Sequence, residues 1–279
     1  MRKLAILSAI LIFLDAAAPL RAADVDGISI HWTSRGSATP AVIFVHGWTC
    51  DETSWQRQVP AISQNYRVIT LDLPGHGKSG SPKDGRFSMA LFARAVEAVR
   101  SEAKVERAVL AGHSMGTPVI RQYALMYPQR VAGLVLVDGL IQLVGTGPGF
   151  ARLQMTGPEG LKIREQFVRS MFSQATSADL QQQILKMTMS TSEATANGAF
   201  AATWDQSTWK NDVITVPVLG VYADRSAVAN RDGMNRLYSN LEYHEIPGTG
   251  HFLMMEKPEE FNRLLLGFLA RVKWIQEFR

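Results

Sequence analysis

The sequence predicts an α/β fold, in which a mostly parallel central sheet is flanked by helices and carries an inserted helical cap. Short apolar runs rich in β-branched residues alternate with stretches of helical spacing, which is typical of βαβ units. One long stretch, residues 139–212, interrupts this alternation. The chain has 279 residues, which is enough for one large domain with a substantial core.

The first residues are expected to lie outside the fold. A basic start, Met1-Arg2-Lys3, precedes an apolar run over residues 4–14 and then small residues up to Ala23. This order is typical of a secretory signal peptide, cut here near Ala22 or Ala23, so we expect a periplasmic or secreted protein with no membrane attachment after cleavage. The alternative, an uncleaved membrane anchor, is disfavoured because the apolar run is short and ends at Asp15.

Composition narrows the possible partners and cofactors. The net charge of +4 is small and scattered, and no run of Lys or Arg predicts binding to nucleic acid. Cys50 is the only cysteine, which excludes an intramolecular disulfide. Without a second cysteine or a histidine cluster at ligand spacing, we expect no metal.

The predicted core occupies residues 24–138 and 213–279. Continuous apolar runs indicate strands buried on both faces, and helical spacing separates them. We expect strands at Ile28–Trp32, Ala41–Val45, Arg67–Leu71, Ala108–Ala111, Val131–Val137, Val216–Tyr222 and Leu241–Ile246, and helices at Met89–Ala103, Val119–Tyr127 and Pro258–Val272.

Residues 139–212 show no strand pattern. A glycine-rich loop at Gly145–Gly149 is followed by helical spacing, as in Ala178–Met187. We expect a helical cap over the carboxyl edge of the sheet, where open α/β sheets bind ligands. The alternative is a set of ordinary crossover helices, but a single crossover needs far fewer residues.

The motif Gly112-His113-Ser114-Met115-Gly116 follows an apolar strand and opens a helix. A serine in such a sharp turn presents its hydroxyl outward, and a side chain at position 112 or 116 would collide with neighbouring backbone. The start of the helix adds a favourable dipole. The context predicts that Ser114 is a nucleophile.

A serine hydroxyl needs a base to attack at neutral pH, and His251 is the candidate. It follows the last predicted strand in the flexible turn Gly248–Phe252, at the carboxyl edge of the sheet. The other histidines fit less well, because they lie within strands or in other turns: His31, His46, His76, His113 and His244.

The negative oxygen formed on attack needs hydrogen-bond donors. The backbone N–H of Met115 is one candidate, since it follows the nucleophile. The other is the N–H of Trp48, in the loop after strand Ala41–Val45, where Gly47 lets the chain turn toward the site. The indole of Trp48 would wall the site; a plain core role for this ring is the alternative, and the two are compatible.

Four motifs together resemble the α/β-hydrolase superfamily, in particular its esterase-like members with a helical cap. They are His46-Gly47-Trp48, the Asp72–Ser79 turn, the Ser114 motif and Gly250-His251-Phe252, and the resemblance covers about residues 40–138 and 213–272. It implies a mainly parallel eight-stranded sheet, a Ser–acid–His triad and no cofactor. Gly75–Ser79 also resembles the end of a phosphate-binding loop, but Asp72 stands where that motif needs Gly, so we interpret it as a turn.

The resemblance leaves the triad acid open. The usual position, beyond the strand ending at Tyr222, falls on Ser226, which cannot serve; Asp224 lies two residues earlier. A subset of relatives carries the acid at the end of the preceding strand, here Asp138. Many relatives also have a purely structural Asp at that point, which caps the next turn. We favour Asp138 and keep Asp224 as the alternative, since both preserve the order Ser, Asp, His.

These observations predict a serine hydrolase that cleaves a small, fairly apolar carboxylic ester. The same triad serves lactonases (acyl-homoserine lactone included), C–C-bond hydrolases and perhydrolases, while a catalytically weak ligand-binding protein is the rival from another class. Residues that could line an apolar pocket, although each could equally be core, are Trp48, Met115, Leu140, Met171, Met187, Met189, Trp204 and Trp209.

Overall fold

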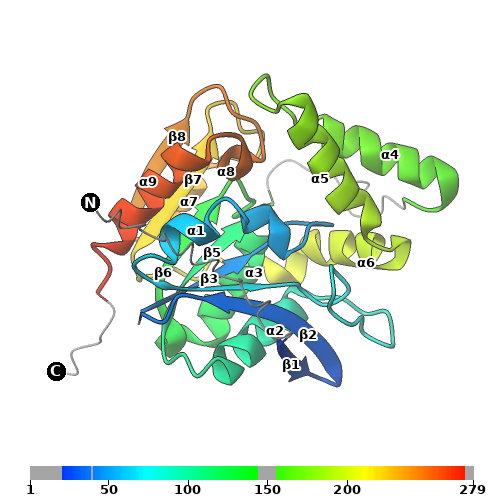
Figure 1. Ribbon diagram of the computed structural model, residues 1–279. Helices are drawn as coiled ribbons and strands as arrows, with labels where there is room; N and C mark the ends of the chain where they lie inside the picture. Colours follow the sequence, from blue (N-terminus) through cyan, green and yellow to red (C-terminus); the bar gives the residue numbers. More distant parts are fainter. Residues whose placement is uncertain (1–20, 39, 144–154, 274–279) are drawn as a thin grey trace, which may run out of the picture.

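The chain folds around one twisted, eight-stranded sheet (Figure 1). The computed structural model describes residues 21–38, 40–143 and 155–273. The strand order is β1-β2-β4-β3-β5-β6-β7-β8. The strands are β1 (Arg21–Val25), β2 (Ile28–Arg35), β3 (Ala41–Val45), β4 (Arg67–Leu71), β5 (Ala108–His113), β6 (Val131–Val137), β7 (Val218–Ala223) and β8 (Leu241–Ile246).

Helices occupy most of the connections. The α-helices are α1 (Val59–Ile62), α2 (Met89–Glu102), α3 (Gly116–Met126), α4 (Gly157–Arg169), α5 (Ala178–Ser190), α6 (Glu193–Thr203), α7 (Arg231–Leu237), α8 (Leu253–Glu256) and α9 (Pro258–Leu269). Short 3-10 helices are η1 (Glu52–Trp55), η2 (Pro128–Arg130) and η4 (Gln206–Thr208). Within the described residues, no helix is both long and apolar enough to cross a membrane.

Most of the sheet is parallel. Only β1 with β2 and β2 with β4 pair antiparallel; the six strands β4, β3, β5, β6, β7 and β8 pair in parallel with one another. The carboxyl ends of these six strands therefore meet at one edge, where side chains from distant parts of the sequence come together.

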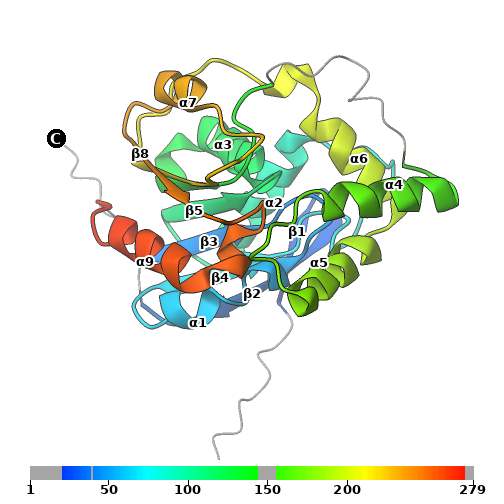
Figure 2. The ribbon, with the colours of Figure 1, turned by 90° about the horizontal axis from the view of Figure 1, so that it is seen from above.

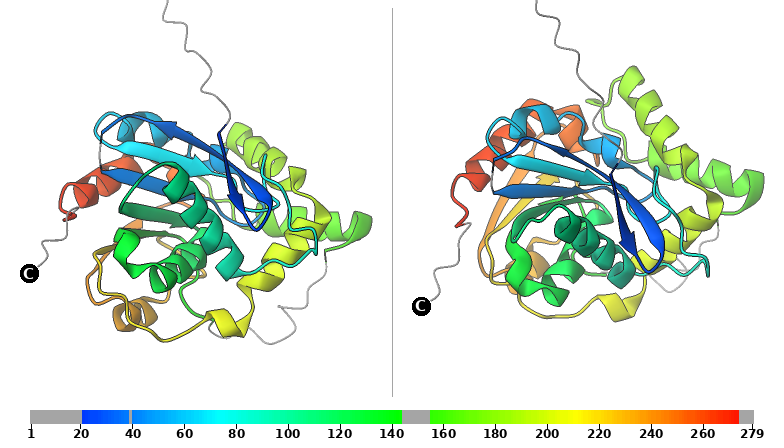
Figure 3. Two further views of the ribbon diagram at one scale, coloured as in Figure 1. Left: turned by 90° about the horizontal axis from the view of Figure 1, so that it is seen from below. Right: turned by 60° about the horizontal axis from the view of Figure 1, so that its bottom comes forward.

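Alternate residues of the central strands enter two separate apolar layers. In β3, Ile43 and Val45 face the layer formed with α2, α3 and α7, while Val42 and Phe44 face the layer formed with α1, α8 and α9. Figure 2 shows α1 and α9 on one side of the sheet and α3 and α7 on the other, and Figure 3 shows α2 beside α3. Burial on both faces explains the continuous apolar runs, since every side chain of β3 is removed from water.

The predicted strands are all present, and four have the predicted bounds: β3, β4, β6 and β8. The eight-stranded, mainly parallel sheet that the resemblance implied is confirmed. One strand had no predicted counterpart. β1 includes residues 21–23, which the sequence assigned to the end of the leader because Ala22 and Ala23 close a stretch of mostly small residues after an apolar run. It pairs with β2, with Ala22 opposite His31, and it is an edge strand of the sheet.

Three helices, α4, α5 and α6, lie over the carboxyl edge of the sheet (Figure 1), and we call them the cap. Serine side chains cap two of them: Ser177 accepts the N–H of Leu180 at the start of α5, and Ser192 accepts that of Thr195 at the start of α6. The described part of residues 139–212 contains no strand, as predicted.

The start of α3 packs against β3 without room for a side chain. A Cβ on Gly116 would lie 2.4 Å from the carbonyl oxygen of Val45, so we expect Gly116→Ala to push the helix and strand apart and to cost about 1–3 kcal/mol of unfolding free energy or more. Gly267→Ala in α9 is the control, because its Cβ would meet only the end of Arg271, at 3.5 Å. Urea denaturation of both variants tests this; equal stabilities would contradict the close approach.

Candidate active site

Ser114 occupies a strained turn between β5 and α3. Its φ of 53° lies in the left-handed region, which non-glycine residues rarely adopt. The turn is held by the N–H of Ser114, which donates to the carbonyl of Val137 at 2.9 Å. A Cβ on Gly112 would lie 2.3 Å from the carbonyl oxygen of Gly116. The expected need for very small residues at both flanking positions is therefore confirmed.

His251 lies beside Asp138 at the carboxyl edge. Nδ1 of His251 donates to Oδ2 of Asp138 at 2.7 Å, which places these residues in contact although they are far apart in the sequence. The other carboxylate oxygen accepts the N–H of Ala223 at 3.1 Å. Ser226 also favours the ionised form of the carboxylate, lowering the pKa of Asp138. This network fixes the ring so that its Nε2 is the basic nitrogen.

Asp138 is nearly fully buried, with 2% exposure. Burial by itself raises the pKa of a carboxyl group, but the hydrogen bond and positive charge from His251, with Ser226 and Ala223, outweigh it and hold the pKa of Asp138 below its ordinary value. Asp138 is therefore ionised at neutral pH, as a carboxylate that stabilises an imidazolium must be.

Asp224, the alternative acid, lies elsewhere. Its side chain is exposed and accepts the N–H of Gly248 at 3.1 Å. The structure therefore places Asp138 in contact with His251. Asp224 instead hydrogen-bonds Gly248, in the loop that precedes His251. Ser226 stands at the usual acid position of the resemblance, and it favours the ionised form of Asp138 instead of serving as the acid.

Ser114 and His251 line one pocket of about 210 Å³ between the sheet edge and the cap. Within the described residues no hydrogen bond joins the two side chains; in unliganded enzymes such bonds are often long and shorten when substrate binds. The pocket is mainly apolar, and its remaining lining residues are Trp48, Met115, Asp138, Leu140, Phe167, Met171, Phe200, Thr203, Trp204 and Val228.

Both predicted oxyanion donors belong to this lining. Met115 directly precedes α3, and Trp48 follows Gly47 in the loop after β3. Neither backbone N–H donates a hydrogen bond to another described residue. The indole N–H of Trp48 donates to the carbonyl of Ala196 in α6 at 2.7 Å, which fixes the ring against the cap.

The expected pocket residues separate into two groups. Trp48, Met115, Leu140, Met171 and Trp204 line the pocket. Met187 is instead buried in the apolar layer that α1, α8 and α9 also enter, and Met189 and Trp209 do not belong to the lining. Trp209 donates its indole N–H to the carbonyl of Thr203. The lining residues that the sequence did not single out are Phe167, Phe200, Thr203 and Val228.

A wider groove of about 850 Å³ adjoins the pocket. It runs between the α4–α5 connection and the loops after β7 and β8, and it shares Asp138, Met171 and His251 with the pocket. Asp224 and Arg225 line it as well, so it is more polar than the pocket. The site therefore has a small apolar compartment and a larger compartment of mixed polarity, and His251 lines both.

His113 supports the base from behind. Its Nε2–H donates to the carbonyl of His251 at 2.8 Å, and the two rings lie 4.8 Å apart. Full burial and the neighbouring His251 lower the pKa of His113 to about 3, so this ring stays neutral. It acts as a fixed donor rather than as a second base.

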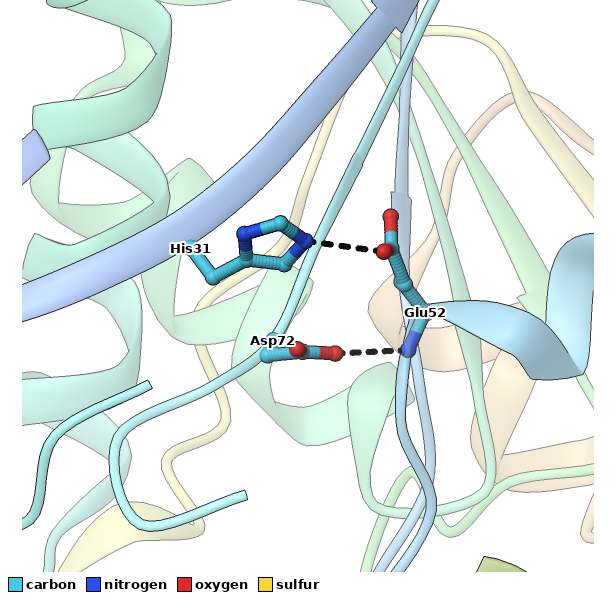
Figure 4. A group of neighbouring side chains, drawn as sticks. All are labelled: His31, Glu52 and Asp72. Atoms are coloured by element: carbon cyan, nitrogen blue, oxygen red, sulfur yellow. Dashed lines mark hydrogen bonds and ion pairs between the residues drawn. The ribbon is translucent and has the colours of Figure 1, made fainter. Parts of the chain in front are cut away.

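A second polar cluster, away from the pocket, joins β2, β4 and the start of η1 (Figure 4). Nε2 of His31 hydrogen-bonds Glu52 at 2.8 Å, and Asp72 accepts the backbone N–H of Glu52 at 2.7 Å. These side chains have the ligand types of a metal site, but the ammonium of Lys78 lies 3.3 Å from the Glu52 carboxylate, and Thr70 donates to its other oxygen. We interpret the cluster as an ion-pair network that holds the loop after β3.

This combination of a parallel sheet, a serine turn and a histidine–carboxylate pair at the carboxyl edge places the chain among the hydrolases of the α/β class. Residues 40–258 match the α/β hydrolase fold family, and the chain belongs to that family.

Curated relatives include proteins with different activities. The dihydrolipoyllysine-residue acetyltransferase component of an acetoin cleaving system from Cupriavidus necator is 40% identical over 124 residues, which are 44% of this chain and 33% of that protein. The chain thus matches only about a third of that relative. A 2-hydroxy-6-oxononadienedioate/2-hydroxy-6-oxononatrienedioate hydrolase from Burkholderia vietnamiensis is 28% identical over 270 residues, which cover 88% of this chain and 92% of the relative.

Solved structures of hydrolases share the fold. A thermophilic esterase from Thermogutta terrifontis superposes with a TM-score of 0.81 at 23% identity, and the match covers 91% of this chain and 99% of that one. Est816, described as an N-acyl homoserine lactone degrading enzyme, superposes with a TM-score of 0.72 at 26% identity and covers 89% of this chain and 100% of its own.

Replacing each candidate acid by its amide separates their roles. Asp138→Asn keeps the shape but turns an amide toward Nδ1 of His251 and removes the negative charge, so we expect turnover to fall about 10⁴-fold with folding retained. Asp224→Asn should stay within about tenfold of the parent, a barrier change of at most about 1.4 kcal/mol. Ester turnover and thermal melting of both variants are the measurements. A collapse for Asp224→Asn alone would assign the acid to Asp224.

Proposed function

We propose that this protein hydrolyses small, fairly apolar carboxylic esters through an acyl-enzyme on Ser114. The observation that carries the proposal is the 2.7 Å hydrogen bond from His251 to the buried carboxylate of Asp138, in a pocket that Ser114 also lines. The N–H groups of Trp48 and Met115 supply the donors that a developing oxyanion requires.

In the proposed reaction, Nε2 of His251 takes the hydroxyl proton of Ser114 as the oxygen attacks the acyl carbon. The carbonyl electron pair moves to the oxygen, which accepts the N–H groups of Trp48 and Met115. When the tetrahedral intermediate collapses, the bond to the alcohol breaks and His251 returns the proton to the departing oxygen. Water then attacks the acyl-enzyme by the same route and releases the acid. Asp138 stabilises the imidazolium in both halves.

The two compartments favour one orientation of the ester. The leaving alcohol must depart beside His251, which opens to the wider, more polar groove, so the acyl group occupies the small apolar pocket. Within the described residues, Arg225 is the only Lys or Arg that lines either hollow, and it lies in the groove. A neutral acyl group therefore fits the pocket better than an acid such as the dioate in the name of the Burkholderia relative.

Lactone hydrolysis is the second candidate. It uses the same groups, and the similarity to Est816 over the whole length of that enzyme favours it. C–C-bond hydrolysis and perhydrolysis share the chemistry as well. Parallel assays with p-nitrophenyl esters and with acyl-homoserine lactones distinguish ester from lactone as the preferred bond.

Export completes the proposal. The basic start and apolar run of residues 1–14 support a cleaved leader, and the protein would then act in the periplasm or outside the cell. Because β1 starts at residue 21, a cut near Ala22 or Ala23 would shorten an edge strand only, which leaves the sheet's centre unchanged.

Ser114 is expected to react with serine-directed reagents. A fluorophosphonate should label Ser114 alone, because the strained turn exposes its hydroxyl to the base and the oxyanion donors. Peptide mapping by mass spectrometry locates the adduct, and Ser114→Ala is the control that should lose both label and ester turnover. Labelling at another serine, with Ser114 unmodified, would overturn the assignment.

The pocket should limit the length of the acyl chain. Trp204 lines the pocket, so Trp204→Ala opens space there and should raise kcat/KM for longer acyl esters relative to the acetate by about tenfold, since each buried CH₂ is worth about 0.8 kcal/mol. Trp209→Ala is the matched control, because this tryptophan lies in the same part of the chain but outside the lining. If the preference for longer acyl esters changes in both variants, or in neither, the assignment of the pocket is contradicted.

A further inference from the structure

The cap and the loop that carries the base are in direct backbone contact. The N–H of His251 donates to the carbonyl of Met171, in the α4–α5 connection (residues 170–177), at 3.1 Å. A Cβ on Gly250 would lie 2.6 Å from that carbonyl oxygen, so only glycine allows this approach. The position of His251 is therefore fixed by the cap as well as by Asp138.

One carboxylate ties the two segments together. Glu256, the last residue of α8, accepts the backbone N–H of Gly250 at 2.6 Å. It also accepts the hydroxyl of Ser173 at 3.2 Å and the hydroxyl of Thr176. Glu256 thus hydrogen-bonds the residue before the base and two residues of the α4–α5 connection at once.

The hydrogen bonds of Thr176 fix the direction in which its hydroxyl proton points. Thr176 is buried, with 3% exposure, and its hydroxyl oxygen also accepts the N–H of Ser173 at 2.8 Å. The hydroxyl proton must then point to Glu256, because a carboxylate can only accept. Thr176 lines neither the pocket nor the groove, so it does not meet a substrate in either compartment.

We propose that Glu256 is a positioning residue that couples the cap to the base. It holds Gly250, and through it His251, in register with the α4–α5 connection, so that the efficiency of the base depends on where the cap lies. The inference rests on the proposed function, because it assigns His251 as the base. It predicts that changes on the cap side of the junction, away from substrate, slow proton transfer from Ser114.

Glu256→Gln is the first test. The amide keeps the shape but removes the negative charge, and its NH₂ group cannot accept the hydroxyl proton of Thr176, so that hydrogen bond is lost or reversed in direction. We expect kcat for a p-nitrophenyl ester, and the rate constant for fluorophosphonate labelling of Ser114, to fall by a similar factor of about tenfold. The dissociation constant for the unreactive product acid should stay unchanged. A purely structural role would lower the melting temperature and leave both rate constants intact.

Thr176→Val tests the coupling from the cap side. It replaces the hydroxyl with a methyl group and so removes the bonds of that hydroxyl to Glu256 and to the N–H of Ser173. We expect both rate constants to fall about threefold, with the fall lost when Glu256 is already Gln. Ser177→Ala is the matched control: its hydroxyl caps α5 and does not contact Glu256, so it should lower the melting temperature without slowing labelling.

The outcomes separate the two proposals. If the parent is not labelled at Ser114, the proposed function fails. If the parent is labelled and Glu256→Gln and Thr176→Val react at the parental rate, the function stands and the coupling is overturned. If Glu256→Gln does not fold, the Thr176→Val and Ser177→Ala pair decides the question alone.

Discussion

The hydrogen bond between His251 and Asp138 is the contact on which the site depends, and the parallel arrangement of the sheet makes this contact possible. Asp138 follows β6 and His251 follows β8, and β7 lies between them. Parallel pairing of β6 and β8 with β7 brings the carboxyl ends of β6 and β8 to one edge of the sheet. It also sets the distance that the side chains of Asp138 and His251 must span to meet. Burial of Asp138 then requires partners, which His251, Ala223 and Ser226 supply. A site of this kind cannot be moved to the opposite edge, where the strands begin.

Strain is concentrated at the same edge. Three of the non-glycine residues in the left-handed region, Thr49, Ser114 and Asp138, flank the pocket or belong to it. Each conformation costs of order 1–3 kcal/mol and persists only where the surroundings determine it. Here the surroundings are buried parallel strands with apolar residues on both faces, so the stability of the sheet's centre maintains unfavourable turns at its rim.

Most of the sheet could be predicted from the sequence because burial on both faces leaves a continuous apolar run, as in Ala41–Val45. The serine turn was predictable for a local reason, since Gly112 and Gly116 are required by close backbone approaches that a sequence pattern records. β1 was not predictable, because its short, alanine-rich segment has little β propensity and follows an apolar run.

The contacts of the site were harder to predict. The choice between Asp138 and Asp224 depends on which carboxylate faces His251 across three strands, which spacing along the chain does not encode. The lining residues Phe167 and Phe200 follow the same helical periodicity as core residues, so the sequence could not separate pocket from core. The role of Glu256 was not predictable, because its partners in the α4–α5 connection lie about 80 residues earlier in the chain.

Trp48 limits which caps from related proteins could replace the cap of this chain. Trp48 lines the pocket, and its indole donates to the carbonyl of Ala196 in α6. A cap transplanted from a relative into this core would have to bring an acceptor to that indole and hydroxyl donors to Glu256, or the loops on both sides of Ser114 would lose their supports. The cap therefore cannot be exchanged by itself. In a chimera, the cap, the loop after β3 and α8 should all come from the same parent protein.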